Sequence, residues 1–337
     1  MSLRQAITPE RTTLRKLGIV LLALALVAGA GCSGAVLGGD GGGGSSDEAL
    51  IEYVPEGQTV VMSFDMAVME DQTTMELLAS SEDDQASQED FQESMTEFEA
   101  ETGLDPSGFN SMLIYGQDTG MSTSVDSSSQ EDVGIVVDTE WSTDELMSAI
   151  ESNDSVSLQE QDYAESGSLY KVVDETSASE DDTYLGVHGN GVFVLGTEGP
   201  VRNSLDITYA DGSALSGTLR EAYDNTRDGY MSFAMTMPED SGSGGSGMGS
   251  QMTSDIQAMT GVYYTSGDTV GLEGRIIMSS EQSAQRLSQG VQMLMTSYSQ
   301  DPEMATVVEN LDVAQDGSDV TFTYESDVQT LIEASES

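Results

Sequence analysis

Residues 61–66 read Val-Met-Ser-Phe-Asp-Met, and residues 230–235 repeat this pattern as Tyr-Met-Ser-Phe-Ala-Met. Residues 133–137 also match residues 270–277, and each of these two segments is followed by residues typical of a helix start. The matching segments lie too far apart for a solenoid, so a repeat of this kind indicates a paired domain. We interpret the chain as a degenerate duplication with halves at 49–218 and 219–335. The alternative is that short β segments match by chance.

Both halves mix short segments rich in Val, Ile, Tyr and Phe, which are typical of strands, with amphipathic helix signals. The expected strands are 59–65, 112–115, 133–138, 169–173, 184–187, 192–195, 229–235, 261–265, 270–277 and 320–324. The expected helices are 90–100, one opening at Ser142 or Thr143, 200–205, 280–298, 302–310 and 327–335. Residues 188–191 and 266–268 have the composition of hairpin turns. The pattern predicts an α+β fold with helices packed on largely antiparallel sheets.

The longest expected helix, 280–298, has an apolar stripe. Its members recur at intervals of three and four residues: Ala284, Leu287, Val291, Leu294 and Tyr298. This spacing places them on one face, which we expect to meet the core.

The N-terminus has the order of segments found in an export signal. Arg4, Arg11, Arg15 and Lys16 precede an apolar run at 17–28, and small residues at 29–31 precede Cys32. The run is shorter than the ~20 apolar residues that a membrane-spanning helix needs, which favours a cleaved signal peptide at 1–31. An uncleaved anchor is the alternative, and the export route, general or twin-arginine, stays open.

Cys32 is the only cysteine of the chain and stands at the cleavage boundary. The segment 29–32 resembles the lipobox of prokaryotic lipoproteins, although Gly29 stands where that family usually has a larger aliphatic residue. The resemblance implies that Cys32 carries palmitate-like lipidation and that residues 32–48, rich in Gly and Ser, form a flexible tether. It implies a lipid-anchored protein on the extracellular side of the cell membrane.

The net charge is extreme, with 60 acidic against 10 basic residues and a formal charge of −50. Such a composition resembles that of proteins from extreme halophiles, because high salt screens the repulsion among the acids. Disorder is the alternative, and it suits residues 38–48, 81–90, 119–132 and 239–255. No basic patch is present, so nucleic acid is excluded as a partner.

The chain also resembles a group of exported haloarchaeal lipoproteins to which no function is assigned. The resemblance rests on Glu52-Tyr53-Val54-Pro55, on Glu101-Thr102-Gly103-Leu104-Asp105-Pro106, and on the 261–274 hairpin that leads into the helix at Ser280. It carries over no catalytic residue.

Catalytic and metal-binding signals are missing. His188 is the only histidine, and its place in an expected turn predicts an exposed side chain rather than a catalytic one. One His and one Cys are too few for a zinc or haem site, so we expect no metal and no cofactor. The single Trp141, near a helix start, is expected to pack in the core. Asn153 begins an Asn-Asp-Ser sequon and is a glycosylation candidate.

These observations favour a non-enzymatic envelope lipoprotein that acts in high salt as a binding or interaction module. Its expected partners are the lipid membrane, through the anchor, and either envelope proteins or a small ligand. A substrate-binding subunit of an importer is the first alternative, and it would need two lobes around a cleft. A hydrolase that uses a pair of acids is the second.

The anchor can be tested by replacing the lipidation residue. In a halophilic host, we expect the native chain in the membrane fraction and accessible to external protease. Cys32→Ser, which has no thiol to acylate, is expected in the medium. Retention of both forms in the membrane would show an uncleaved helix instead, and recovery of either from the cytoplasm would contradict export.

Overall fold

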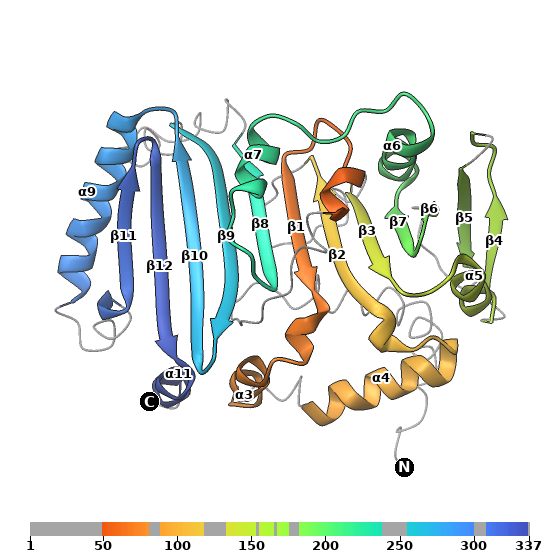
Figure 1. Cartoon of the computed structure of the whole chain (residues 1–337), viewed down its shortest axis with the longest axis horizontal. Coiled ribbons are helices and arrows are strands. Elements are labelled where there is room, and N and C mark those ends of the chain that lie inside the picture. Colours follow the sequence, from red (N-terminus) through yellow and green to blue (C-terminus); the bar gives the residue numbers. More distant parts are fainter. Residues whose placement is uncertain are drawn as a thin grey trace, which may run out of the picture.

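A twelve-stranded antiparallel sheet is the central element of the fold (Figure 1). The structure is a computed structural model and describes residues 49–80, 88–117, 133–152, 155–164, 167–174, 182–237, 255–299 and 308–335. The strands follow the order β11-β12-β10-β9-β8-β1-β2-β3-β7-β6-β5-β4. The expected α+β class is confirmed, and the strands of both halves belong to one continuous sheet.

The first half contains the larger set of elements. Its strands are β1 (Val60–Asp65), β2 (Phe109–Gly116), β3 (Val133–Thr139), β4 (Val156–Glu160), β5 (Ser168–Asp174), β6 (Thr183–Gly189) and β7 (Val192–Gly196). Its helices are η1 (Ile51–Tyr53), η2 (Met66–Met69), α3 (Gln72–Ser80), α4 (Gln88–Thr102), η3 (Pro106–Gly108), α5 (Thr143–Glu151) and α6 (Glu198–Tyr209).

The second half has the same order of elements in shorter form. It consists of α7 (Thr218–Asp224), β8 (Met231–Thr236), β9 (Ile256–Ser266), β10 (Thr269–Met278), α9 (Glu281–Tyr298), β11 (Leu311–Asp316), β12 (Asp319–Asp327) and α11 (Val328–Ser335). In both halves three antiparallel strands lead to a helix, two hairpin strands and a further helix, and the first half adds β4 and β5. The proposed boundary at 218/219 falls at the start of α7 and stays a prediction.

The two halves meet where β1 pairs with β8. Ser63 lies directly opposite Ser232, and their buried hydroxyls are 2.7 Å apart. Each serine is the third residue of its copy of the repeated segment, and Phe64 and Met231 pair as the counterparts of Phe233 and Met62. Because equivalent residues face each other, an approximate twofold axis passes through the serine pair.

A tyrosine covers a glycine at equivalent places in both halves. Tyr115 of β2 pairs with Gly134 of β3, and Tyr264 of β9 pairs with Gly271 of β10. A Cβ atom added to Gly134 would lie 2.2 Å from the Tyr115 ring, and one added to Gly271 would lie 2.3 Å from the Tyr264 ring. Glycine is therefore required for the ring to lie flat over the neighbouring strand.

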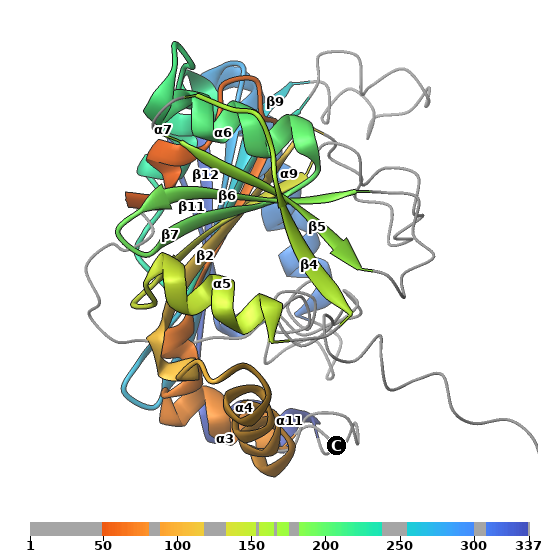
Figure 2. The same ribbon diagram turned by 90° about the vertical axis from the view of Figure 1, so that its right-hand side faces the viewer.

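Helices cover the sheet on both faces. Neighbouring residues of β3 show the alternation, since Val136 packs into a core beneath η1, α6 and α7, and Val137 packs into a core with α4 and α5. Figure 2 shows α6 above and α5 below the strands of the first half. Met231 packs against the core with α4 and α5 and also against a further core, which includes residues of α3 and α11. It therefore connects these two cores.

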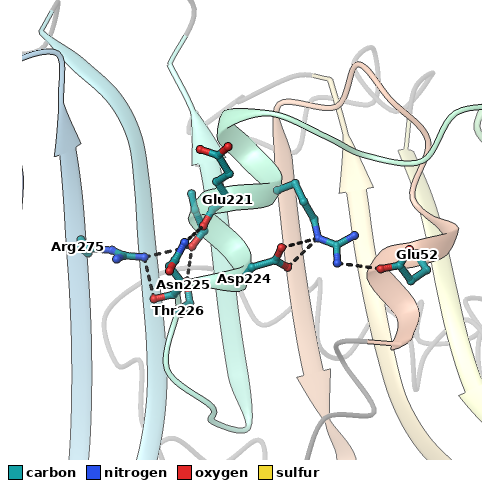
Figure 3. A network of polar contacts seen from close by, with 8 residues as sticks. Glu52, Glu221, Asp224, Asn225, Thr226 and Arg275 are labelled. Carbon is teal, nitrogen blue, oxygen red and sulfur yellow. Dashed lines mark hydrogen bonds and ion pairs between the residues drawn. The ribbon is translucent and has the colours of Figure 1, made fainter.

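Two arginine side chains connect helix α7 to η1 of the first half and to β10 of the second half (Figure 3). Arg220 donates to both carboxylate oxygens of Asp224, at 2.7 and 2.8 Å, and to Glu52 of η1 at 2.8 Å. Arg275 of β10 donates to the carbonyl oxygen of Asn225, at 2.8 Å, just beyond the last turn of α7. A cation is favourable there because the helix C-terminus carries partial negative charge.

Several elements of the structure were not predicted from the sequence. It did not predict α3, α7 or β4, which are short and lack a strong apolar period. Helix α4 begins at Gln88, inside a segment for which disorder was the alternative. The expected helix 302–310 lies largely outside the described residues.

The stripe on α9 meets the core only in its first half. Ala284 is fully buried, whereas Leu294 is 56% exposed and Tyr298 is 49% exposed. The expectation that the whole stripe faces the core is wrong, because helical spacing fixes which residues share a face but not how far the sheet extends beneath it.

The tyrosine–glycine pairs give a stability test of the way in which the two rings pack. We expect Gly271→Ala to lower the free energy of unfolding by about 1–3 kcal/mol, because the new methyl group displaces the Tyr264 ring. Gly134→Ala should cost a similar amount. Denaturant titration measures both changes.

Gly274→Ala on the same strand is the matched control, since the nearest atom to its added Cβ is 3.7 Å away. Equal stability of the Gly271 and Gly274 variants would contradict the steric account.

Candidate functional site

An apolar cavity of about 70 Å³ lies between the sheet, α4 and α5. Val137, Leu185, Phe193 and Leu195 of β3, β6 and β7 line it from the sheet. The helices contribute Met95 and Phe98 of α4 and Leu146 and Ile150 of α5, and the remaining wall consists of Met66, Pro106, Phe109, Thr139 and Trp141. The hydroxyl of Thr139 donates to the carbonyl of Gly191 at 3.0 Å, so this polar group of the wall is already hydrogen-bonded.

The start of α5 sets one side of the cavity. Ser142 caps the helix by accepting from the backbone N–H of Glu145 at 3.3 Å, and the Glu145 carboxylate accepts from the backbone N–H of Ser142 at 2.8 Å. The pKa of Glu145 is lowered by the Ser142 hydroxyl, which donates to the Glu145 carboxylate at 2.6 Å, and by the hydrogen bond from the Ser142 backbone N–H. The capping box that results fixes where α5 begins, and therefore where Leu146 and Ile150 enter the wall. Of the two expected caps, Ser142 or Thr143, it is Ser142 that caps the helix.

Trp141 is held in the cavity wall by its indole N–H, which donates to the carbonyl of Asp105 at 2.9 Å. Its ring lies 6.0 Å from those of both Phe98 and Phe109. The residue was expected to pack in the core, and it does contact the core, but it is only half-buried and faces the cavity. The sequence did not reveal the cavity itself, because its walls come from segments far apart along the chain.

The cavity adjoins a larger open hollow of about 540 Å³. Met66, Met95, Pro106 and Phe109 line both spaces. The rest of the hollow is mainly polar and is lined by Asp65, Ala67, Met69, Glu70, Ser107, Asn110 and Asp138. The cavity is therefore apolar, and the hollow beside it, which we call its entrance, has acidic side chains.

A turn and a β-bulge shape the entrance. The side chain of Asp65 accepts from the backbone N–H of Ala67 at 2.8 Å and begins η2. Asn110 sits where the β2–β3 register shifts, and its amide donates to Asp138 at 3.2 Å. A bulge of this kind redirects a side chain, which explains how Asn110 reaches the hollow.

His188 lies apart from this site and is buried, so the expectation of an exposed turn residue is wrong. The turn consists of Asn190 and Gly191, while His188 lies within β6, at the register shift between Val187 and Gly189. Its Nδ1 lies 3.0 Å from Thr208 and its Nε2 lies 3.0 Å from Ser204. Because Ser204 donates its proton to the Tyr53 carbonyl, we assign Nε2 as the protonated nitrogen. Burial lowers the pKa of His188 to about 4.

Other expected features lie outside the described residues or go untested. Cys32 and Asn153 are both outside the described ranges. Within those ranges, no group of three or more His, Cys, Asp or Glu side chains is placed to hold a metal ion. None of the described helices combines the length and the apolar character needed to cross a membrane.

Comparison with known proteins gives structural matches alone. No family model matches the chain, and no curated protein matches it in sequence. Crystal form III of TP0453 aligns with a TM-score of 0.45 and 9% identity, over 87% of this chain and 98% of that chain. Crystal form I aligns with a TM-score of 0.43 and 10% identity, over 86% and 97% of the two chains.

The buried histidine predicts a specific loss of stability in acid. The pKa of His188 is lower in the folded state than the unfolded value of about 6.5, so protons bind preferentially to the unfolded chain. Its contribution to the free energy of unfolding falls as the pH drops from about 6.5 toward 4. Between pH 7 and pH 5 the loss is about 2 kcal/mol.

His188→Gln cannot titrate in this range and should lack that loss. The measurement is denaturant unfolding of both proteins at pH 7 and pH 5, in which the many carboxylates contribute equally to both. Parallel stability changes in the two proteins would contradict the burial of a neutral His188.

Proposed function

We propose that the chain is an exported, lipid-anchored binding protein of the cell envelope. In this proposal the cavity beside Trp141 receives the apolar part of a small ligand. The observation that carries it is an apolar cavity that adjoins an open hollow with polar side chains in its wall, which is the usual construction of a ligand site. The anchor at Cys32 and the Gly/Ser tether would hold that site outside the membrane.

The size of the cavity limits what can enter. At about 70 Å³ it suits a short alkyl group rather than a whole drug-sized ligand, so the remainder of the ligand would occupy the hollow. Each buried methylene contributes about 0.8 kcal/mol. A short alkyl probe is therefore expected to bind with a dissociation constant near 1 mM, equivalent to about 4 kcal/mol.

The alternatives have less support. An importer subunit would need two lobes around a cleft, whereas the described strands of both halves lie in one sheet. A hydrolase that uses a pair of acids would act where Asp65 and Asp138 line the hollow. Turnover of a polysaccharide or peptide, lost on Asp138→Asn, would favour that alternative.

Trp141 provides a built-in reporter, because it is the only tryptophan of the chain and lines the cavity. We expect 1-hexanol to change the Trp141 emission in a saturable manner as it enters the cavity. Val137→Phe should abolish this change, because the added ring carbons fill the space that the alkyl chain needs. Fluorescence titration of the purified full chain measures both.

Met293→Phe is the control, since Met293 is 72% exposed on α9 and its ring would lie in solvent. Should Val137→Phe fail to fold, Ile150→Phe fills the same cavity from α5. An unchanged titration in a folded cavity-filling variant would contradict the proposal, as would the absence of any saturable signal in the native chain.

A further inference from the structure

Four side chains line both the cavity and the hollow, and we call them the rim: Met66, Met95, Pro106 and Phe109. Two of the four carry a thioether sulfur. Met66 is the first residue of η2 and Met95 belongs to α4, so the two thioethers come from separate elements. Both residues are half-buried. An alkyl group that enters the cavity from the hollow therefore passes methionine side chains of two elements.

The start of η2 determines where Met66 lies. The Asp65 carboxylate accepts from the backbone N–H of Ala67 at 2.8 Å, and this cap fixes the first residue of the helix. In a 3₁₀ helix, side chains three residues apart lie one above the other. Met69 follows Met66 at this spacing and also lines the hollow. Local structure therefore directs two thioethers of η2 toward the same open space.

A small oxidant can reach the rim through the hollow. The hollow is open and measures about 540 Å³, whereas one water occupies about 30 Å³ in the liquid. Hydrogen peroxide is only slightly larger than water, so it enters with the solvent. The methionines of the cores differ, since Met112 is 1% exposed and Met278 is 2% exposed. Exposure therefore distinguishes the rim methionines from these two buried ones.

Among the described residues that line the cavity, no side chain has a free donor for a new polar group. Thr139 and Trp141 carry the two side-chain donors of the wall, and they already donate to the carbonyl oxygens of Gly191 and Asp105. A sulfoxide oxygen is a hydrogen-bond acceptor, and burying it without a donor costs free energy. An oxidised rim methionine must therefore turn its oxygen to the water of the hollow, and its apolar contact with the cavity is lost.

From these observations we propose that the rim is an oxidation site. Peroxide converts Met66 and Met95 to methionine sulfoxide, and the polar side chains that result weaken the binding of alkyl groups in the cavity. A sulfur lone pair attacks one oxygen of hydrogen peroxide and the O–O bond breaks. The transferred oxygen stays on sulfur, and the other leaves as water with both hydrogens. The thioether loses two electrons and the peroxide gains them.

This inference rests on the proposed function and adds a chemical control of the same site. Sulfoxide formation is reversible, because methionine sulfoxide reductases return the side chain to the thioether. The rim therefore has two states, one apolar and one polar, and the cavity binds alkyl groups more tightly in the apolar state.

Oxidation and binding are measured on the same samples of the purified full chain. After hydrogen peroxide treatment, peptide mass spectrometry should find sulfoxide at Met66 and Met95 while Met112 and Met278 stay unmodified. The Trp141 titration with 1-hexanol should then give an affinity about fivefold lower than before treatment, because the apolar contact with the rim is lost. Methionine sulfoxide reductases should restore the affinity.

A double variant, Met66→Leu with Met95→Leu, removes the rim sulfur and keeps apolar side chains of similar volume. Whatever its own affinity for 1-hexanol, it should give the same dissociation constant before and after peroxide. Met69→Leu is the matched control, because Met69 lines the hollow but not the cavity. It should lose affinity on oxidation as the native chain does. Should the double variant fail to fold, recovery with the reductases tests the same link in the native chain.

The outcomes separate this inference from the proposed function. Unmodified Met66 and Met95 in a chain whose Met293, 72% exposed, is oxidised would overturn the inference, as would an unchanged affinity of the oxidised native chain. An equal loss of affinity in the double variant would do the same, and in each case the binding cavity would stand. If 1-hexanol gives no saturable signal before peroxide, the proposed function fails first and the inference falls with it.

Discussion

The pairing of β1 with β8 is the constraint on which the rest of the structure depends. It joins two related halves into one sheet through strands whose equivalent residues face each other, with the Ser63–Ser232 hydrogen bond at the centre. A buried hydroxyl needs a partner, and here each copy of the repeated serine satisfies the other. This pair fixes the register, because a slip by one residue would move every apolar side chain of β1 to the wrong face.

Charge is the second constraint. A chain with 60 acids and 10 bases has few cations to pair with its acids, and several of the bases that the structure describes join different elements. Arg220 and Arg275 connect α7 to η1 and to β10, and Arg286 connects α9 to the start of β9. Surface repulsion of this kind weakens at high salt, where screening is strong.

The candidate site arises where the two halves differ. The first half has α4 between β1 and β2 and the additional strands β4 and β5, and the cavity lies beneath α4 and α5. The cavity therefore lies beside elements of the first half that the described part of the second half does not contain.

The sequence by itself determined most of the strand segments, the capped start of α5 and the hairpin turns, because each depends on side chains close together along the chain. Only the tertiary structure decided that His188 is buried, that Leu294 and Tyr298 lie beyond the core, and that Asp65, Ser111 and Asp138 form one row. Local spacing sets which face a residue occupies, but burial and partners depend on what packs against that face from elsewhere in the chain.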